Sequence, residues 1–277
     1  MKKYFRFIKI EHTLFSLPLI YAGVFLAAKD TPSIQLLVLV LFAAVGARIV
    51  AMSLNRIIDS EIDKRNIRTN SRELPSGKMK IIEAVGIALL GLLLYLSSAY
   101  YISFFCFILS PIPLIIFSVY PYLKRFTKFA HFGVGLGLAM APLGGWFAVK
   151  GSFDDFFTGL LLPLFTLFWA TGFDIIYSTM DEDFDRSVGL YSLPSRLGTK
   201  KALQISSILH ILAFTILVLL FVLSIKSLAA FPVLLIAGFL LYLEQKKSSD
   251  VELAFFKINA VIGFVILLMV LMKGIQI

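Results

Sequence analysis

The residues best suited to chemistry are acidic side chains that gather at two places in the chain. Nine of the seventeen Asp and Glu residues lie within positions 59–73 and 174–185. In the first group, Asn55, Asp59 and Asp63 recur every four residues, so a helix would carry them on one face over about two turns. Carboxylates on adjacent turns repel each other, and more strongly in a low-dielectric site. This spacing predicts a cation that both carboxylates bind.

The second acidic group repeats this arrangement later in the chain. Asp174, Asp181 and Asp185 are separated by seven and then four residues, so they also share one helical face, with Tyr177 between them. Each group is followed by a basic segment that closes in Leu-Pro-Ser, at 74–76 and 193–195. The two groups together predict carboxylates that face each other across the mouth of a cavity.

The elements that must position these side chains are long apolar helices. The chain has 277 residues, is 59% hydrophobic and has a mean hydropathy of +0.90, which lies well outside the range of soluble domains. The pattern predicts an all-α integral membrane protein, with a polar bend near Ser97 and Ser98 between its third and fourth helices. Apolar runs able to span about 30 Å of hydrocarbon predict nine membrane helices, at 13–28, 34–54, 81–99, 101–121, 129–149, 156–178, 202–223, 227–243 and 253–272.

The two acidic groups are four predicted helices apart. This period indicates a duplicated four-helix unit, helices 1–4 and 5–8, followed by a ninth helix. Because an even number of crossings separates the groups, both lie on the same side of the membrane. Glycines at 133, 135 and 137 superficially resemble a dinucleotide-binding fingerprint. No strand precedes them, so we expect them to permit close packing between helices.

Basic residues are distributed unevenly between the two ends of the predicted helices. The segments 1–10, 59–80, 122–128, 179–201 and 245–251 share one side and hold 19 of the 26 Lys and Arg residues. This asymmetry predicts that the N-terminus and both acidic groups face the cytoplasm, from a multi-pass position in the inner membrane. It also accounts for the net charge of +9 without a nucleic-acid partner. We expect residues 1–10 to lie on the membrane as an amphipathic segment and the loop 64–80 to fold over the cavity.

Carboxylate oxygens at a cavity mouth are the ligands that Mg²⁺ prefers, and Mg²⁺ is usually held by one or two carboxylates together with substrate phosphates. Arg68, Arg72 and Lys124, with Arg196 as a further candidate, lie at the same rim and suit a diphosphate. The helices below are rich in the 27 Phe residues of the chain, which suits a long hydrocarbon. We therefore predict an isoprenyl diphosphate bound with its head at the membrane surface and with aromatic faces near its allylic cation.

Three motifs, Asn55-xxx-Asp59-xxx-Asp63, Tyr120-xxx-Lys124 and Asp181-xxx-Asp185, resemble those of the UbiA family of intramembrane prenyltransferases. The stretches 12–18, 55–63, 72–77 and 174–177 look most similar to its 4-hydroxybenzoate polyprenyltransferases. The resemblance covers essentially the whole chain and implies one domain, 1–277, with nine helices around a central cavity that opens laterally to lipid. It also implies Mg²⁺-dependent transfer of a polyprenyl group from its diphosphate to a ring carbon of a small aromatic acid.

The resemblance further implies roles for individual residues. Those expected to bind Mg²⁺ and diphosphate are Asp59, Asp63, Asp181 and Asp185, assisted by Asn55. Those expected to contact the substrates are Arg68, Arg72 and Lys124 at the diphosphate, with Tyr120 and Tyr177 beside them, and Arg48 at the carboxylate of the acceptor. Asp174 is expected to orient the acceptor or to act as an acid or base. Glu182 and Asp183 depart from the family pattern, so the metal ligands of the second group stay open.

Several alternatives remain on sequence alone. The acceptor predicted is 4-hydroxybenzoate, for quinone biosynthesis, but prenyltransferases of menaquinone synthesis by the futalosine route share these motifs, and ether-lipid or haem prenylation are further branches. A transporter or cation channel is the alternative of another class, and it would place the acids near the bilayer midplane. The three histidines, at 12, 131 and 210, are too scattered for a metal site and are expected to be packed or interfacial. Oligomeric state and donor chain length are not indicated.

Overall fold

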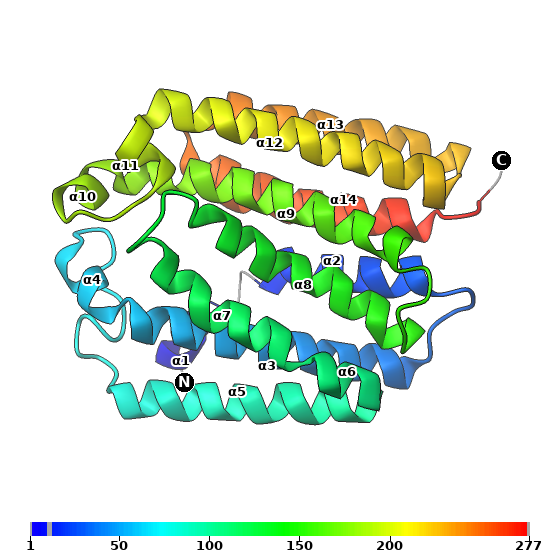
Figure 1. The fold of residues 1–277 in the computed structure, drawn as a ribbon, viewed down its shortest axis with the longest axis horizontal. Coiled ribbons are helices and arrows are strands. Elements are labelled where there is room, and N and C mark those ends of the chain that lie inside the picture. Colours follow the sequence, from blue (N-terminus) through cyan, green and yellow to red (C-terminus); the bar gives the residue numbers. More distant parts are fainter. Residues whose placement is uncertain (1, 10–12, 276–277) are drawn as a thin grey trace.

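The structure is a computed structural model that describes residues 2–9 and 13–275, and within these ranges the chain forms helices and no strand (Figure 1). The long helices are α2 (Thr13–Ala27), α3 (Ile34–Ile58), α5 (Ile81–Ile102), α7 (Pro111–Leu123), α8 (His131–Lys150), α9 (Phe156–Ser178), α12 (Thr199–Leu220), α13 (Phe231–Lys246) and α14 (Asn259–Leu271). The short ones are α1 (Lys2–Ile8), α4 (Ser60–Arg65), α6 (Phe104–Leu109), α10 (Glu182–Ser187) and α11 (Leu193–Leu197).

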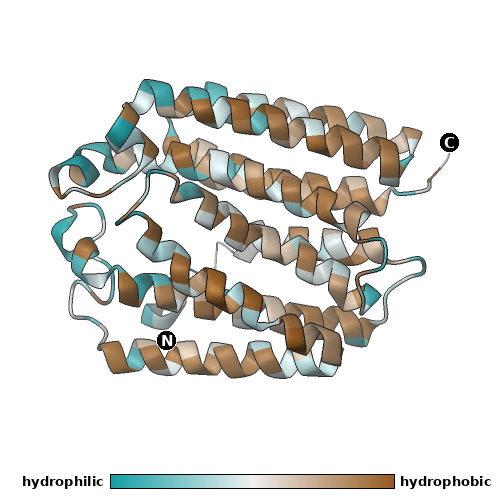
Figure 2. Ribbon diagram, viewed as in Figure 1, coloured by the Kyte–Doolittle hydropathy of each residue, from teal (hydrophilic) through white to brown (hydrophobic). Residues whose placement is uncertain are grey.

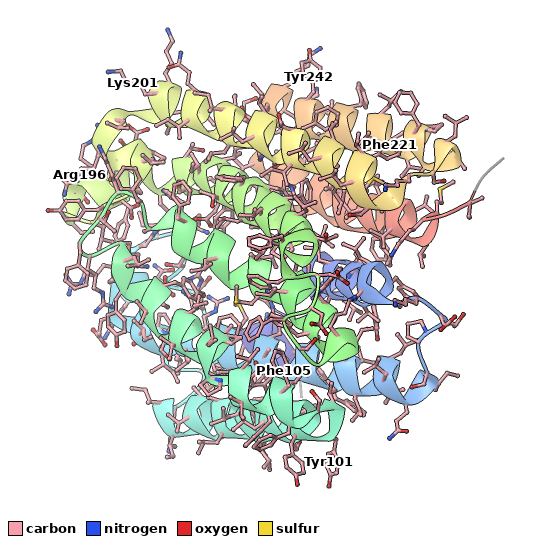
Figure 3. All side chains as sticks on the ribbon, turned by 45° about the vertical axis from the view of Figure 1, so that its right-hand side comes forward. Tyr101, Phe105, Arg196, Lys201, Phe221 and Tyr242 are labelled. Carbon is pink, nitrogen blue, oxygen red and sulfur yellow. The ribbon has the colours of Figure 1, made fainter. Side chains whose placement is uncertain are left out.

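The predicted all-α membrane protein is confirmed, although the predicted number of nine spans is not. Among the described residues, eight helical segments are long and apolar enough to cross a membrane, and the apolar stretch Ser16–Ala27 is shorter. That stretch belongs to α2, whose 15 residues rise only about 22 Å, less than the hydrocarbon thickness of about 30 Å. Large side chains such as Tyr101 and Tyr242 point outward from the bundle, as expected of surfaces that face lipid (Figure 3).

The break between the third and fourth predicted spans lies at Ser103, so the predicted bend at Ser97 and Ser98 was wrong. Both serines stay inside α5, where their hydroxyls donate to the Leu94 carbonyl at 3.2 and 2.7 Å. Serine hydroxyls that bond to their own helix do not interrupt it. Ser103 instead adopts extended backbone geometry, and its side chain accepts a hydrogen bond from the Cys106 amide at the start of α6.

The helices are arranged as the proposed duplication predicts. In the first half α3 packs along α5, and in the second half α9 packs along α12, so each helix that leads into an acidic group is held by the next long helix (Figure 1). The halves meet where α2 packs against α8, and α14 lies against both α2 and α13. The hydrophobic core is centred on the fully buried Phe165 and Trp169 of α9.

Glycines permit close helix contacts, as the sequence predicts for Gly133 and Gly135, whereas a Cβ added to Gly137 would meet only ordinary contacts at 3.7 Å or more. A Cβ added to Gly135 would lie 2.3 Å from Thr171 Oγ1 of α9, and one added to Gly145 would lie 2.1 Å from the carbonyl oxygen of Ile20 in α2. Both distances are shorter than any contact that a real Cβ makes, so only glycine fits at these crossings.

Polar segments collect at one end of the bundle, around α4, α10 and α11 (Figure 2). We call the loop 66–80, which follows α4, the cap loop. Helix α1 packs against this end, because Phe7 is fully buried beside Met79 and Ala84, and Lys3 Nζ lies 2.6 Å from Glu83 Oε1. Helix α1 therefore packs against the protein, while its Tyr4 and Phe5 are exposed; that this segment lies on the membrane stays a prediction.

Candidate active site

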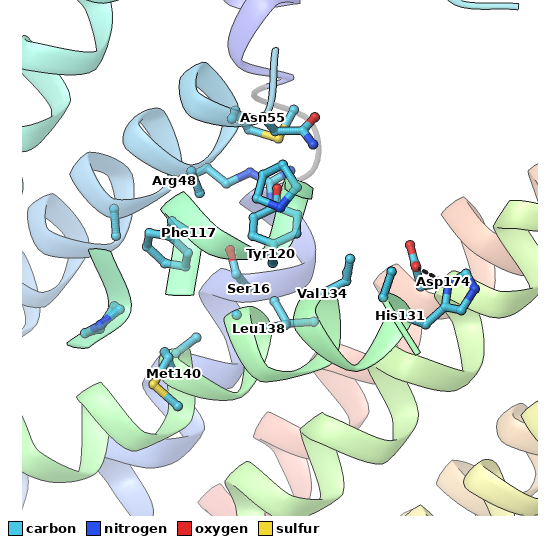
Figure 4. Close-up of a pocket in the computed structure, with 18 of the residues that line it drawn as sticks. Ser16, Arg48, Asn55, Phe117, Tyr120, His131, Val134, Leu138, Met140 and Asp174 are labelled. Carbon is cyan, nitrogen blue, oxygen red and sulfur yellow. Dashed lines mark hydrogen bonds and ion pairs between the residues drawn. The ribbon is translucent and has the colours of Figure 1, made fainter. Parts of the chain in front are cut away.

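A cavity of about 500 Å³ extends from the polar end of the bundle into its apolar interior. Its deeper walls are apolar and come from α3, α5, α7 and α8, with Ala43, Phe117 and Phe147 among them. The structure brings all twelve predicted site residues to the walls of this one cavity: Arg48, Asn55, Asp59, Asp63, Arg68, Arg72, Tyr120, Lys124, Asp174, Tyr177, Asp181 and Asp185. Figure 4 shows several of them.

The first acidic group lies where α3 passes into α4. The Asp59 amide donates to the Asn55 carbonyl at 3.0 Å, and the Asp63 amide donates to the Asp59 carbonyl at 2.8 Å, so the helical turn continues through the junction. The predicted shared face is therefore present. Asn55 Nδ2 donates to Asp59 Oδ2 at 3.2 Å, and Asp59 and Asp63 are only 4% and 5% exposed.

The spacing of the second acidic group predicted one continuous helical face, but the structure divides these residues between α9, a 3₁₀ turn and α10. Helix α9 ends at Ser178, a 3₁₀ turn covers Thr179–Asp181, and α10 then begins at Glu182. The tighter turn changes the angular position of the residues that follow it. Asp174, Asp181 and Asp185 nevertheless all reach the cavity, because the chain bends around its mouth.

Basic side chains lie directly on the carboxylates. Lys124 Nζ is 2.7 Å from Asp59 Oδ2, and Arg72 Nη1 is 2.6 Å from Asp63 Oδ2. The Arg68 guanidinium contacts both oxygens of Asp181, with Nε donating to Oδ1 at 2.9 Å. Charged hydrogen bonds of this kind are the strong ones, and a two-point Arg–carboxylate contact also fixes orientation.

The cap loop joins the two acidic groups. Asn66 Nδ2 donates to Asp181 Oδ1 at 2.7 Å, and Arg68 Nη1 donates to the Tyr177 hydroxyl at 2.7 Å. A loop of the first half thus contacts the acidic group of the second half. Asn66 is not among the residues predicted from the sequence, because its only signal there is its position in the basic loop between Asp63 and Arg68.

Burial and charge pairing act against each other on the groups at the cavity mouth. Burial raises the pKa of the Asp59 carboxyl above its ordinary value, and the neighbouring Lys124 opposes that rise. For Arg68, burial is the largest single influence and lowers the pKa, but the hydrogen bonds and charges of Asp181 and Tyr177 together outweigh it, so the pKa is raised. Asp59 therefore benefits from a cation close to it.

The donor set fits a complex of Mg²⁺ with diphosphate. Within residues 2–9 and 13–275, no three carboxylate, imidazole or thiol side chains are gathered as the ligands of one ion. Mg²⁺ needs only one or two carboxylates when water and phosphate complete its shell. Asp59 Oδ1 is buried and has no hydrogen-bond partner among the described residues, and Arg125 Nη2 lies 3.8 Å away. The alternation of acidic and basic groups matches a ligand that carries both charges.

Arg48 of α3, Tyr120 of α7, His131 of α8 and Asp174 of α9 also line the cavity (Figure 4). His131 Nδ1 is 2.7 Å from Asp174 Oδ2. The sequence predicted a packed histidine. It is buried, at 4% exposed, but it also lines the cavity and contacts a site residue. No local signal identified this pair, because the two residues are 43 positions apart.

The remaining candidates lie away from the site or outside the described residues. Arg196 does not line the cavity. Its guanidinium lies 3.8 Å from the ring centroid of Tyr191, and it sits at the edge of the molecule (Figure 3). His210 is buried among helices, as predicted, with Gln245 Nε2 2.9 Å from its Nδ1. His12 lies outside the described residues.

Comparison with known proteins adds to this geometry. The sequence profile of the UbiA prenyltransferase family matches residues 16–269. A 4-hydroxybenzoate octaprenyltransferase of Francisella tularensis subsp. novicida (strain U112) is 26% identical over 203 residues, or 72% of this chain and 71% of that protein. The apo structure of a UbiA homolog from Aeropyrum pernix K1 matches with a TM-score of 0.89 and 31% identity, over 96% of this chain and 99% of that one. A UbiA homolog from Archaeoglobus fulgidus bound to DMAPP and Mg²⁺ shares the fold, with a TM-score of 0.75 and 19% identity, over 99% of this chain and 100% of that one.

Proposed function

The chain belongs to the UbiA prenyltransferase family, and from that premise we propose that it transfers a polyprenyl group from a polyprenyl diphosphate to 4-hydroxybenzoate, for quinone biosynthesis. The observation that carries the proposal is one cavity with a charged mouth and an apolar interior. Two clusters of acidic side chains and three basic side chains line its mouth. The Francisella relative is named for the same acceptor. Prenyltransferases of menaquinone or ether-lipid synthesis are the alternatives within the family.

In this proposal the cavity mouth holds the diphosphate. Asp59, Asp63, Asp181 and Asp185, with Asn55, would hold Mg²⁺, which when bound neutralises the diphosphate as its bond to the prenyl carbon breaks. Arg68, Arg72 and Lys124 would donate hydrogen bonds to diphosphate oxygens, after giving up part of their present contacts to the carboxylates. The Archaeoglobus homolog, solved with DMAPP and Mg²⁺, supports the use of this metal.

The allylic carbon would then lie below the mouth, against aromatic rings. The ring centroids of Tyr177 and Phe255 are 4.3 Å apart, and Phe173 lies 5.3 Å from Phe255. All three residues line the cavity. The faces of aromatic rings stabilise a cation, and an apolar wall keeps water from it, so these side chains would favour ionisation while preventing hydrolysis.

The acceptor would bind deeper, at Arg48. A guanidinium suits the carboxylate of an aromatic acid because it can donate two parallel hydrogen bonds. Arg48 precedes Asn55 by seven residues on α3, which places it about 10 Å further into the membrane. The aromatic ring of the acceptor would then lie between the allylic carbon above and Arg48 beside it.

The protein is a multi-pass membrane protein, and we place its polar end in the cytoplasm. The basic segments that predict this sidedness include the cap loop at the polar end of the bundle (Figure 2). We further treat residues 1–277 as one prenyltransferase domain. The transporter alternative required carboxylates near the bilayer midplane, whereas Asp59, Asp63, Asp181 and Asp185 lie beyond or at the ends of α3 and α9.

The experiment is a product assay with purified protein in lipid. We expect 4-hydroxybenzoate and a polyprenyl diphosphate to yield a prenylated acid and diphosphate, identified by mass, and expect EDTA to abolish turnover. Asp59→Ala and Asp181→Ala should lose turnover, while Asp30→Ala, an exposed acid outside the cavity, should keep it. Full turnover in EDTA or in both active-site variants would overturn the metal assignment. Turnover with another aromatic acceptor, and none with 4-hydroxybenzoate, would overturn only the acceptor.

A further inference from the structure

The chain forms a π-helix at Glu252–Ile258, immediately before α14. In a π-helix the backbone bonds span five residues instead of four, and such turns are rare and frequent at functional sites. Phe255 lies in this turn and lines the cavity, with its ring centroid 4.3 Å from that of Tyr177 and 5.3 Å from that of Phe173. Because each residue turns an α-helix by about 100°, an α-helix in place of this turn would rotate Phe255 relative to α14 and to these rings.

The side chain of Asn259 fixes the end of the π-helix. Its backbone N–H donates to the Phe256 carbonyl, three residues back. Its side-chain Nδ2 donates to the Phe255 carbonyl at 3.0 Å, four residues back, where an α-helix would use the backbone N–H. The residue that presents its ring to the cavity is therefore held, at its carbonyl, by a side chain.

Two neighbouring helices hold that side chain in turn. Asn259 Oδ1 accepts from Trp169 Nε1 of α9 at 2.9 Å, and Nδ2 also donates to Glu244 Oε1 of α13 at 3.0 Å. All three residues are at most 1% exposed, and none of them lines the cavity. Buried polar and ionisable groups are costly inside a membrane protein and usually mark a function. The chemistry described above uses none of the three, and what they hold in common is the π-helix that carries Phe255.

We propose that Asn259 is a positioning residue that keeps Phe255 at the site of ionisation and thereby excludes water from the allylic cation. This inference rests on the proposed function. When the C–O bond of the donor breaks, its electron pair leaves with the diphosphate and the cation can be captured in two ways. A ring carbon of the acceptor forms a C–C bond and loses its proton, or a water oxygen forms a C–O bond, loses a proton and gives the prenyl alcohol. An apolar ring held at the cation blocks the second route.

The test measures the ratio of prenyl alcohol to prenylated acid at saturating 4-hydroxybenzoate. Both products come from the same active molecules, so the ratio does not depend on how much of a variant is folded. Water enriched in heavy oxygen labels only the alcohol formed by attack on carbon, since a contaminating phosphatase would break the P–O bond instead. Asn259→Ala should raise the ratio by at least about tenfold, because a misplacement of about 1 Å can change a rate by about 10²-fold. An unchanged ratio would overturn the proposal.

Two buried tryptophans offer a matched comparison. Trp169→Phe removes the N–H that holds Asn259, whereas Trp146→Phe removes the same atoms from α8, where Nε1 has no hydrogen-bond partner among the described residues. Trp146 is 3% exposed and does not line the cavity. We expect the ratio of alcohol to acid to rise in Trp169→Phe and to keep its wild-type value in Trp146→Phe. Equal rises in both would show a general loosening of the core and overturn the role of the Asn259 contact.

A double variant tests whether Asn259 acts through Phe255. Phe255→Leu removes the ring and keeps an apolar side chain, and Phe256→Leu makes the same change at the next position, which does not line the cavity. We expect a raised ratio in Phe255→Leu and a wild-type ratio in Phe256→Leu. Adding Asn259→Ala to Phe255→Leu should give no further rise, because two changes that act through one contact are not additive. Effects that multiply would overturn the route through Phe255.

Failure of the proposed function would give a different result. A wild type that forms neither product with any aromatic acid would overturn the proposed function and this inference with it. A wild type that prenylates another aromatic acid would change only the acceptor, and the same ratios would be measured with that acid. A wild type that prenylates, with wild-type ratios in both Asn259→Ala and Phe255→Leu, would overturn the positioning role alone.

Discussion

The contact between α2 and α8 offers a sharp test of how the cavity is built, because two adjacent glycines in α8 face different surroundings. A Cβ at Gly145 would lie 2.1 Å from the Ile20 carbonyl oxygen and 2.9 Å from the Val24 amide nitrogen of α2. A Cβ at Gly144 would meet nothing within 4 Å, and this residue lines the cavity. Gly145→Ala and Gly144→Ala are therefore a matched pair that adds the same methyl group on the two sides of one helix.

The expected cost of Gly145→Ala follows from these distances. The two backbones must separate by about 1 Å before the new contact reaches even a tight 3.0 Å, and backbone atoms cannot rotate away as a side chain can. Overpacking costs about 1–3 kcal/mol, and we expect the upper end here. At about 2–4 °C per kcal/mol for a chain of this size, the melting temperature should fall by about 6–12 °C.

Gly144→Ala should instead keep or slightly raise the melting temperature, because alanine favours a helix over glycine by about 0.5–1 kcal/mol. The assay is the temperature at which half of the detergent-solubilised protein is lost from its gel-filtration peak. Equal melting temperatures for the two variants, or a larger loss for Gly144→Ala, would refute the close approach of α2 and α8.

Three further outcomes are expected. Arg48→Gln should raise KM for the aromatic acid by at least about tenfold, since a hydrogen bond to a charged group contributes about 1.5–3 kcal/mol. The same variant should leave KM for the prenyl donor unchanged. Parallel changes in both KM values would contradict the proposed position of Arg48 at the acceptor. Cys106, which lines the cavity, should react more slowly with a maleimide when a long-chain prenyl diphosphate and Mg²⁺ are present, and protection by inorganic diphosphate alone would show that the tail does not reach it. Glu244 is fully buried and accepts a hydrogen bond from Asn259 Nδ2 at 3.0 Å. Glu244→Leu should therefore destabilise the protein by about 1–3 kcal/mol, because it leaves the Asn259 amide unsatisfied. Glu244→Gln keeps the acceptor and should melt at a higher temperature than Glu244→Leu.

The helices were predictable from the sequence because each membrane span requires a long apolar run. In lipid such a run can hydrogen-bond its backbone N–H and C=O groups only by forming a helix. The run 156–178 coincides with α9, and the run 34–54 falls within α3. The turns were less predictable. Ser97 and Ser98 carry the composition of a bend, yet their hydroxyls find a partner in the preceding turn of α5, and the chain breaks at Ser103 instead.

That the predicted residues would gather at one cavity was also predictable, because helical spacing and the four-helix period do not depend on tertiary detail. The partners of each side chain were not. Lys124 contacts Asp59 across 65 positions, and Arg68 contacts Asp181 across 113. Such pairs depend on how α7 ends and on how the cap loop crosses the cavity mouth, and no local pattern encodes either. His131 escaped notice for the same reason, since its partner lies on a neighbouring helix.

These partnerships explain how the two acidic groups can share one cavity mouth. Four carboxylates at a partly buried cavity mouth repel one another, and the three basic side chains among them offset that repulsion. One of these contacts joins the two halves of the protein, since Arg68 in the cap loop of the first half contacts Asp181 in the second half. Another joins distant elements of the first half, since Lys124 at the end of α7 contacts Asp59 after α3. A diphosphate bound as proposed would compete with the carboxylates for these cations, so its binding would leave carboxylates that need a new positive partner. We therefore expect Mg²⁺ and diphosphate to bind together much more tightly than either binds alone.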